Sequence, residues 1–340
     1  MLEPLTGRLL APLSLLEGVD VDRLDRIAVR MWPRHADAGQ VLFRQGDPGD
    51  TFGLVLQGQV QVTLETTDGS RLLADATAGS IVGELSLLRR QPRTATITAV
   101  TPTVLAMGKA AALELLLDIP EVHDRVRRLA SARLARDLRP VRALLKDGSP
   151  ILVRPLLAED RAAFDSELHR LSKVSLRRRF FSAADPSESM VDYLVHIDYV
   201  DHFAWVVLDS DDHRQGLATA RFVRLAHPDE AEMAFGTADR HQGRGIGTFL
   251  LGAIGVAAVE AGITKLFGHV LEDNAAMRAV FAKVDSASHF DEPGVLLVKT
   301  EAAAAAALLP EATRHELAAA VHDVVTAASL ALTSPPTGEG

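Results

Sequence analysis

The chain of 340 residues contains no cysteine. This absence excludes disulfides, thiolate metal sites and a cysteine acyl-enzyme, and we expect no metal. No apolar run is long enough to span a bilayer, and the N-terminal MLEPLTGRLLAPLSLL lacks the basic head and cleavage site of a signal peptide. The sequence therefore predicts a cytoplasmic protein that does not bind membranes.

The chain also has no excess of positive charge, because its formal net charge is −9. This balance argues against general nucleic-acid binding. The content of hydrophobic residues, 47%, and of charged residues, 24%, is that of an ordinary globular protein, and the length favours two domains.

The first domain, residues 1–146, is expected to be a compact all-β unit with short strands and flanking helices. Apolar residues at helical spacing predict short helices over 13–31, and alternating polar and apolar residues predict strands from about 40 to 107. A basic helix is expected over 123–146, with Pro140 kinking or ending it.

The turn DGSP at 147–150 marks the expected domain boundary. Residues 147–300 alternate predicted strands and helices, including a helix from Gly245 to Ala261, which indicates an α/β domain. The alanine-rich segment 301–340 predicts a helix around ELAAAVHDVVTAASLAL and a disordered end, TSPPTGEG.

The stretch GELSLLRRQPRTATIT, residues 83–98, carries the first chemically informative pattern. Arg93 can give a forked, charge-assisted hydrogen bond to a phosphate, whereas Glu84 can accept a hydrogen bond from a sugar hydroxyl. Backbone N–H groups after Glu84 would complete a phosphate cradle. The alternative is a surface ion pair between Glu84 and Arg93 that closes a loop.

Together with RQGDPGD at 44–50 and LVLQGQVQV, this stretch resembles the cyclic-nucleotide-binding domain family over residues 13–140. The resemblance implies that this domain is a β-roll with flanking helices. It also implies that Glu84 holds the ribose 2′-hydroxyl, that Arg93 holds the cyclic phosphate, and that cAMP is the allosteric effector. Thr94 borders the base and leaves the choice between cAMP and cGMP open. Arg133 is either a cap over the base or a solvated arginine. The implied nucleotide-binding residues are Gly83, Glu84, Leu85, Ser86, Arg93, Thr94 and Arg133.

A second glycine-rich stretch, HQGRGIG at 241–247, lies between a predicted strand and an amphipathic helix. Gly243, Gly245 and Gly247 allow a close backbone approach, and the helix N-terminus favours an anion. The spacing Gly-x-Gly-x-Gly differs from the dinucleotide fingerprint, and a tightly packed helix cap is the alternative.

This loop resembles the pyrophosphate loop of the GNAT acyltransferases, and the likeness extends over 151–300. It implies acetyl-CoA as co-substrate, with residues 235–237 pairing with the pantetheine arm like an added strand. Two positions depart from the family pattern, because Phe281 replaces a frequent tyrosine acid and Asp285 replaces a glycine. The implied acetyl-CoA residues are Phe235, Gly236, Thr237, Gln242, Gly243, Arg244, Gly245, Ile246, Gly247, Thr248, Asn274 and Lys283.

Acetyl transfer to an amine requires a base, because neutralising a lysine at pH 7 costs about 4.6 kcal/mol. Glu232, on the predicted strand EMAFGTA, is the expected base, since burial there would make it more basic. Its alternative is a strand-edge carboxylate facing water, and Asp239 and His241 are competing bases. The lack of cysteine favours direct attack in a ternary complex.

The order of the two domains resembles the actinobacterial cyclic-nucleotide-regulated protein lysine acetyltransferases. That resemblance implies a partner protein with a target lysine, with an acyl-CoA synthetase as the expected partner. In that family the C-terminal segment can cover the active site, so the alanine-rich tail is either such a cover or a packed helix. The alternatives are a transcription factor, a small-molecule N-acetyltransferase and a non-catalytic acyl-CoA sensor.

Overall fold

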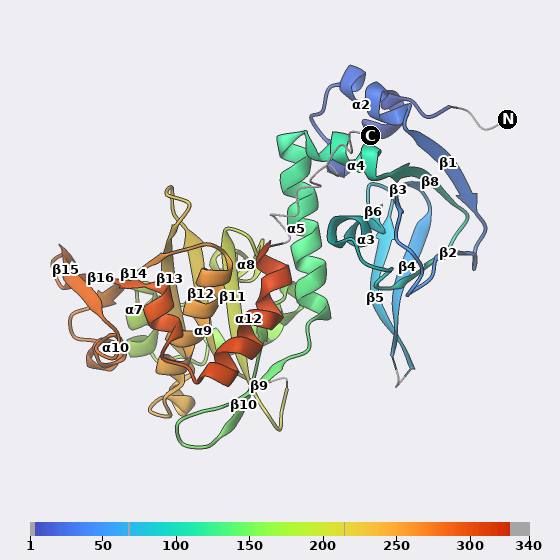
Figure 1. Cartoon of the computed structure of the whole chain (residues 1–340). Coiled ribbons are helices and arrows are strands. Elements are labelled where there is room, and N and C mark those ends of the chain that lie inside the picture. The colour runs from blue at the N-terminus through green and yellow to red at the C-terminus, as the bar shows by residue number, and fades with distance from the viewer. Residues whose placement is uncertain (1–3, 67–68, 214, 327–340) are drawn as a thin grey trace, which may run out of the picture. The chain divides into compact units, whose positions relative to one another are not determined.

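The computed structural model describes residues 4–66, 69–213 and 215–326 (Figure 1). The chain divides between Ala130 and Ser131 into two compact units, within the helix α5 (Pro120–Asp137). Each unit has its own sheets and core, so each is described by itself.

The division lies earlier than the expected boundary at 146/147. Helix α5 ends at Asp137, and β9 (Val141–Leu144) follows Pro140 and pairs with β10 (Pro150–Pro155). Proline has no N–H to continue a helix, which explains why the basic helix ends before Pro140, one of the two predicted effects of this residue. Residues 141–146 therefore belong to the second unit.

The first unit is the expected β-roll. Its described strands form two four-stranded antiparallel sheets, in the orders β1-β8-β3-β6 and β2-β7-β4-β5. Val55, Val60, Val82, Leu105 and Met107 meet in the core between them. The strands are β1 (Met31–Ala36), β2 (Val41–Phe43), β3 (Thr51–Gln57), β4 (Gln59–Thr66), β5 (Gly69–Thr77), β6 (Ile81–Val82), β7 (Thr96–Ala99) and β8 (Thr103–Lys109), and the helices are α1 (Gly7–Leu10), α2 (Val21–Ala28), α3 (Glu84–Arg89) and α4 (Ala110–Leu117).

The second unit is built on one sheet in the order β15-β16-β14-β13-β12-β11-β10-β9. Every described neighbouring pair is antiparallel except β13 and β14, which are parallel. The remaining strands are β11 (His202–Asp209), β12 (Gly216–Arg224), β13 (Glu230–Thr237), β14 (Lys265–Leu271), β15 (Ser286–Glu292) and β16 (Val295–Glu301), of which β15 was not predicted.

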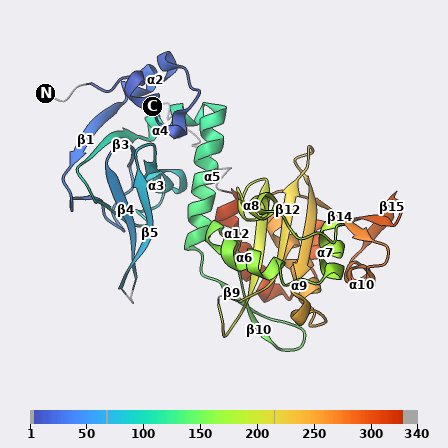
Figure 2. The same ribbon diagram turned by 180° about the vertical axis from the view of Figure 1, so that it is seen from behind.

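Helices cover both faces of this sheet (Figures 1 and 2). On one face lies α9 (Ile246–Glu260), which is almost wholly buried and accepts a 2.9 Å hydrogen bond at the Ala253 carbonyl from Trp205 Nε1. On the other face lie α6 (Arg161–Leu168), α7 (Lys173–Phe180) and α8 (Glu188–Val195). The short helix α10 (Ala275–Phe281) follows β14.

The C-terminal segment packs against α9. It contains α11 (Ala302–Ala306) and α12 (Glu311–Thr326), whose buried Leu317, Val321 and Val324 hold it in place. The predicted C-terminal helix is thus confirmed up to Thr326, whereas its continuation and TSPPTGEG lie outside the described residues. No helix in the described part of the chain is long and apolar enough to cross a membrane.

Candidate functional site

The first candidate site surrounds the start of α3 in the first unit. Gly83 adopts a left-handed conformation, with φ of 76°, which turns the chain from β6 into the helix. Glu84 is 1% exposed and Arg93 is 5% exposed. A surface ion pair is therefore wrong as an explanation of these two residues, because both are buried.

Arg93 is held from several sides. Its Nη1 donates to the carbonyl oxygens of Thr51 at 2.7 Å and Gly83 at 2.8 Å, and its Nη2 donates to Thr51 Oγ1 at 2.9 Å. The guanidinium also lies 4.0 Å above the ring of Phe43. Burial lowers the pKa of Arg93, and the nearby carboxylates, Asp50 first, oppose that shift. The result is a fixed buried cation.

The loop 46–50 packs against this cradle. The N–H of Gly46 donates to the Arg93 carbonyl at 2.9 Å, and the N–H of Arg93 donates to the Asp47 carbonyl at 2.8 Å. A Cβ on Gly49 would lie 2.1 Å from the Cβ of Ser86, so the loop approaches α3 as closely as glycine allows. Thr94 follows Arg93 and is half-buried.

The seven predicted nucleotide-binding residues do not all fall in one unit. Gly83, Glu84, Leu85, Ser86, Arg93 and Thr94 lie together in the first unit. Arg133 lies on the part of α5 that belongs to the second unit, where it is half-buried. Its role as a cap stays a prediction.

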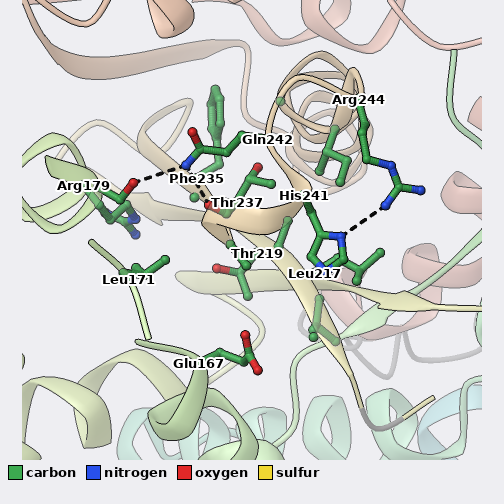
Figure 3. A pocket seen from close by; sticks show the side chains of 18 of the residues that line it. Glu167, Leu171, Arg179, Leu217, Thr219, Phe235, Thr237, His241, Gln242 and Arg244 are labelled. Atoms are coloured by element: carbon green, nitrogen blue, oxygen red, sulfur yellow. Dashed lines mark hydrogen bonds between the residues drawn. The ribbon is translucent and has the colours of Figure 1, made fainter. Parts of the chain in front are cut away.

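The second candidate site is a cavity of about 1000 Å³ within the second unit (Figure 3). Its walls come from α6, α7, β12, β13, the loop before α9, the start of α9 and α10. All twelve residues expected at the acetyl-CoA site line it. Its described lining ends at Lys283, so the described part of the C-terminal tail does not cover it.

The glycine loop forms one wall. Gly243 and Gly245 have φ angles of 79° and 86°, in the region where glycine is least strained. The fifteen-residue helix α9 begins directly after them at Ile246. Its first residues line the cavity, so the N–H groups at its N-terminus lie in the cavity wall. A Cβ on Gly247 would lie 3.3 Å from Val280 of α10, which shows how closely the loop and α10 approach.

Basic side chains stand around this loop. Arg244 donates to His241 Nδ1 at 3.1 Å, as Figure 3 shows, and its Nε lies 3.4 Å from Asp147 Oδ2. Lys283 is exposed and donates to Thr248 Oγ1 at 2.6 Å. The wall therefore offers backbone donors and cations, as a pyrophosphate requires.

The strands β13 and β14 separate beside the cavity. They pair only over Glu230–Glu232 and Lys265–Phe267, whereas β12 pairs with β13 as far as Thr237. Residues 233–237 therefore present one backbone edge without a described partner strand. This edge fits the expected pairing with a pantetheine arm.

The helix α10 supports the same wall. Asn274 is buried and lines the cavity, and its Oδ1 accepts a hydrogen bond from the N–H of Met277 at 3.2 Å, so it also caps α10. Phe281, at the position of the missing tyrosine, is buried with its ring centroid 6.0 Å from that of Phe235. Asp285 lies beyond α10 and is exposed.

Glu232 lies at the last paired position of β13 before the strands separate. Its side chain is 49% exposed and does not line the cavity, so the expectation that it is buried is wrong. Its Oε1 lies 3.2 Å from Nδ1 of His269 on β14. The exposure matches the alternative of a carboxylate facing water, and its role as base stays a prediction.

Of the competing bases, Asp239 is engaged in structural hydrogen bonds. It accepts from the N–H of Ser172 at 2.8 Å and from Ser175 Oγ at 2.5 Å. Burial by itself would raise the pKa of Asp239. These hydrogen bonds outweigh that effect, and the pKa of Asp239 is lowered. His241 lines the cavity, where burial and the neighbouring Arg240 and Arg244 lower its pKa.

Two arginines of the second unit were not predicted from the sequence, and one of them lines the cavity. Arg179 of α7 lines the cavity next to Gly236, and burial lowers its pKa to about 10 while Glu232 opposes the shift. Arg221 is buried on β12, donates to the Leu194 carbonyl at 2.9 Å, and has a pKa lowered by burial to about 9. The run SLRRRFFSA is the only sequence signal for Arg179, and a single arginine on a strand gave none for Arg221.

Comparison with known proteins supports both halves. The family model "Cyclic nucleotide-binding domain" matches residues 33–119, and the model "Acetyltransferase (GNAT) family" matches residues 172–285. The fold and the sites thus define a cyclic-nucleotide-binding domain joined to a GNAT domain.

Two relatives and one solved structure are similar to this chain. Acetyltransferase Pat from Mycolicibacterium smegmatis is 37% identical over 293 residues, covering 86% of this chain and 88% of that protein. A cAMP-dependent protein kinase regulatory subunit from Dictyostelium discoideum is 35% identical over 27% of this chain and 29% of its own length. The solved structure of a cAMP-binding acyltransferase from Mycobacterium smegmatis is 32% identical, with a TM-score of 0.48, covering 95% of this chain and 98% of that one.

The chain belongs to the family of acetyltransferase Pat. It is a GNAT-type acetyltransferase that uses acetyl-CoA and carries a cyclic-nucleotide-binding domain. The predicted family, fold class and type of enzyme are confirmed.

Proposed function

We propose that this chain is a cAMP-regulated protein lysine Nε-acetyltransferase that transfers the acetyl group directly from acetyl-CoA in a ternary complex. The observation that carries the proposal is the cavity, because all twelve expected acetyl-CoA residues line it and Glu232 stands where β13 leaves β14. The acyl donor and the acceptor amine would meet at the point where β13 and β14 separate.

We propose Glu232 as the base. It would take one proton from the lysine ammonium, and the neutral amine would attack the thioester carbonyl. Backbone N–H groups of residues 233–237 would stabilise the developing oxyanion. The C–S bond then breaks, and the thiolate takes the second amine proton. Phe281 offers no hydroxyl for that step, so the proton passes from the amine itself or from water.

The nucleotide proposed for the first unit is cAMP. Its cradle combines a buried cation, Arg93, with a buried carboxylate, Glu84, the pair that a cyclic phosphate and a ribose hydroxyl need. The similarity of this region to a cAMP-dependent kinase regulatory subunit supports cAMP. A coupling free energy of 1–3 kcal/mol would change acetyl transfer about 5- to 150-fold.

The proposed acceptor is a lysine on a partner protein, with an acyl-CoA synthetase as the first candidate. The test measures transfer of labelled acetyl groups from acetyl-CoA to a purified synthetase, with cAMP, with cGMP and without nucleotide. We expect labelled lysine and a several-fold response to cAMP. Labelling of small amines alone, or binding of acetyl-CoA without any transfer, would contradict the protein substrate.

Glu232→Gln tests the base. Removing a general base lowers kcat by about 100-fold or more, whereas the KM for acetyl-CoA should hardly change because Glu232 lies outside the cavity lining. Glu316→Gln, an exposed carboxylate on α12, is the control. Near-normal turnover of Glu232→Gln would remove Glu232 from the role.

A further inference from the structure

His269 on β14 lies between two carboxylates. Its Nδ1 is 3.2 Å from Glu232 Oε1 on β13, and its Nε2 is 3.3 Å from Asp291 Oδ2 on β15. The imidazole ring forms a T-shaped contact with the ring of Phe181, with ring centroids 6.5 Å apart. The side chain of His269 is 34% exposed, so the ring has contact with solvent.

Hydrogen-bond chemistry limits the protonation states of this cluster. An ionised carboxylate only accepts hydrogen bonds, and a neutral imidazole has one donor nitrogen and one acceptor nitrogen. With both carboxylates ionised and the imidazole neutral, one ring nitrogen would direct its lone pair at a carboxylate oxygen. One additional proton removes this mismatch, whether it resides on His269 or on the Glu232 carboxyl.

We propose that His269, anchored by Asp291, is a positioning residue for Glu232 that receives the proton Glu232 takes from the acceptor amine. This inference rests on the proposed role of Glu232 as base. Uptake of the proton produces an imidazolium with one carboxylate oxygen 3.2 Å from Nδ1 and another 3.3 Å from Nε2, so the deprotonation of the amine is favoured.

The proton balance is complete. Acetylation of an ammonium by acetyl-CoA yields an amide, free CoA thiol and one released proton. That proton passes from the amine to Glu232 Oε1, then to Nδ1 of His269, and leaves from the exposed ring to water. Three described cations lie near these strands. Arg179 on α7 interacts electrostatically with Glu232, Lys299 on β16 lies over the ring of Phe267, and Lys265 on β14 pairs with Glu230.

The test uses the full chain with acetyl-CoA and an acceptor protein. In His269→Ala we expect kcat to fall at least about tenfold, the lower end of the effect of losing one hydrogen bond to a charged group, with the KM for acetyl-CoA unchanged. Added imidazole should restore part of the rate. His289→Ala is the matched control, because His289 lies on β15 and pairs with the same Leu297 of β16 from the other side.

A second background separates positioning from general damage. In Glu232→Gln, adding His269→Ala should change kcat by less than about twofold, because residues that act through one another are not additive. Asp291→Asn should lower kcat, as His269→Ala does. It also serves as the test variant if His269→Ala melts at a lower temperature.

Each outcome decides between the two proposals. An unchanged kcat in both His269→Ala and Asp291→Asn, or a tenfold loss that persists in Glu232→Gln, overturns the role of His269 while the base is retained. Normal turnover of Glu232→Gln alone overturns the base.

Discussion

Replacing Arg93 by lysine separates the shape of the guanidinium from its charge. A lysine keeps the positive charge but supplies a single nitrogen, so it cannot reproduce the bonds from Nη1 and Nη2 to Thr51 and Gly83 together with a forked bond to a phosphate. The loss of one charge-assisted hydrogen bond is worth about 1.5–3 kcal/mol. We expect the Kd for cAMP to rise about 10- to 150-fold.

Alanine would be the poorer test. Without the guanidinium, the carbonyl oxygens of Thr51 and Gly83 would lose their donor, and each buried unsatisfied group costs about 1–3 kcal/mol. Such a change would mix a loss of affinity with a loss of folding. The lysine variant limits that effect because its ammonium can still reach one of the two oxygens.

The assay is calorimetric titration of the full chain with cAMP, together with a thermal melt. Arg30→Lys is the control, because Arg30 is exposed and its guanidinium donates only to the Arg26 carbonyl, at 3.1 Å, among its described hydrogen bonds. A wild-type Kd in an Arg93→Lys protein that melts normally would refute the assignment of Arg93 to the phosphate.

Three further predictions follow from the second unit. Gly255→Ala should lower the free energy of unfolding of this unit by about 2 kcal/mol, because the new Cβ would lie 2.5 Å from the Ala306 nitrogen. Gly216→Ala is the control and should leave the stability unchanged, because nothing lies within 4 Å of its new Cβ. Equal melting temperatures of the two variants would contradict this prediction. Burial, and to a smaller extent the charge of Arg221, lowers the pKa of His202 to about 4. As the pH falls, the unfolded chain therefore binds a proton on this residue near pH 6.5, whereas the folded chain binds it only near pH 4. Stability should therefore fall by about 3 kcal/mol from pH 7 to pH 4 in urea titrations, with a smaller fall in His202→Gln. Lys283→Ala should raise the KM for acetyl-CoA about two- to fivefold at low salt, and an equal effect at high salt would argue against a phosphate contact.

Much of the fold could be predicted because its signals are local. Alternation along QVQVTLE and the glycine loop before α9 depend on neighbouring residues, and β4 and α9 form where these patterns place them. The strand β9 could not be found in this way, because VRALL follows a basic helix and reads as its continuation. Only pairing with β10, a tertiary contact, makes it a strand.

The acetyl-CoA residues could be predicted because loop and strand are contiguous motifs. Exposure could not be predicted, and Glu232 shows why. Its neighbours Ala231 and Met233 are buried, yet its own side chain points to the opposite face, where strand separation leaves it open. Arg179, His269 and Asp291 come from three other elements, and no spacing in the sequence links them to Glu232.

The exposure of Glu232 has a mechanistic consequence. A carboxylate in contact with water is a weak base for a lysine ammonium, and it becomes a stronger one when burial removes that water. The described cavity does not supply this burial, because its lining stops short of Glu232. The acceptor must therefore supply it, by covering the half-exposed carboxylate and His269 when its lysine enters. A free amine too small to cover both would leave the base solvated, so we expect its kcat, more than its KM, to fall below that of a protein acceptor. Equal kcat values for a folded acceptor protein and a small amine would show that burial by the acceptor is not required.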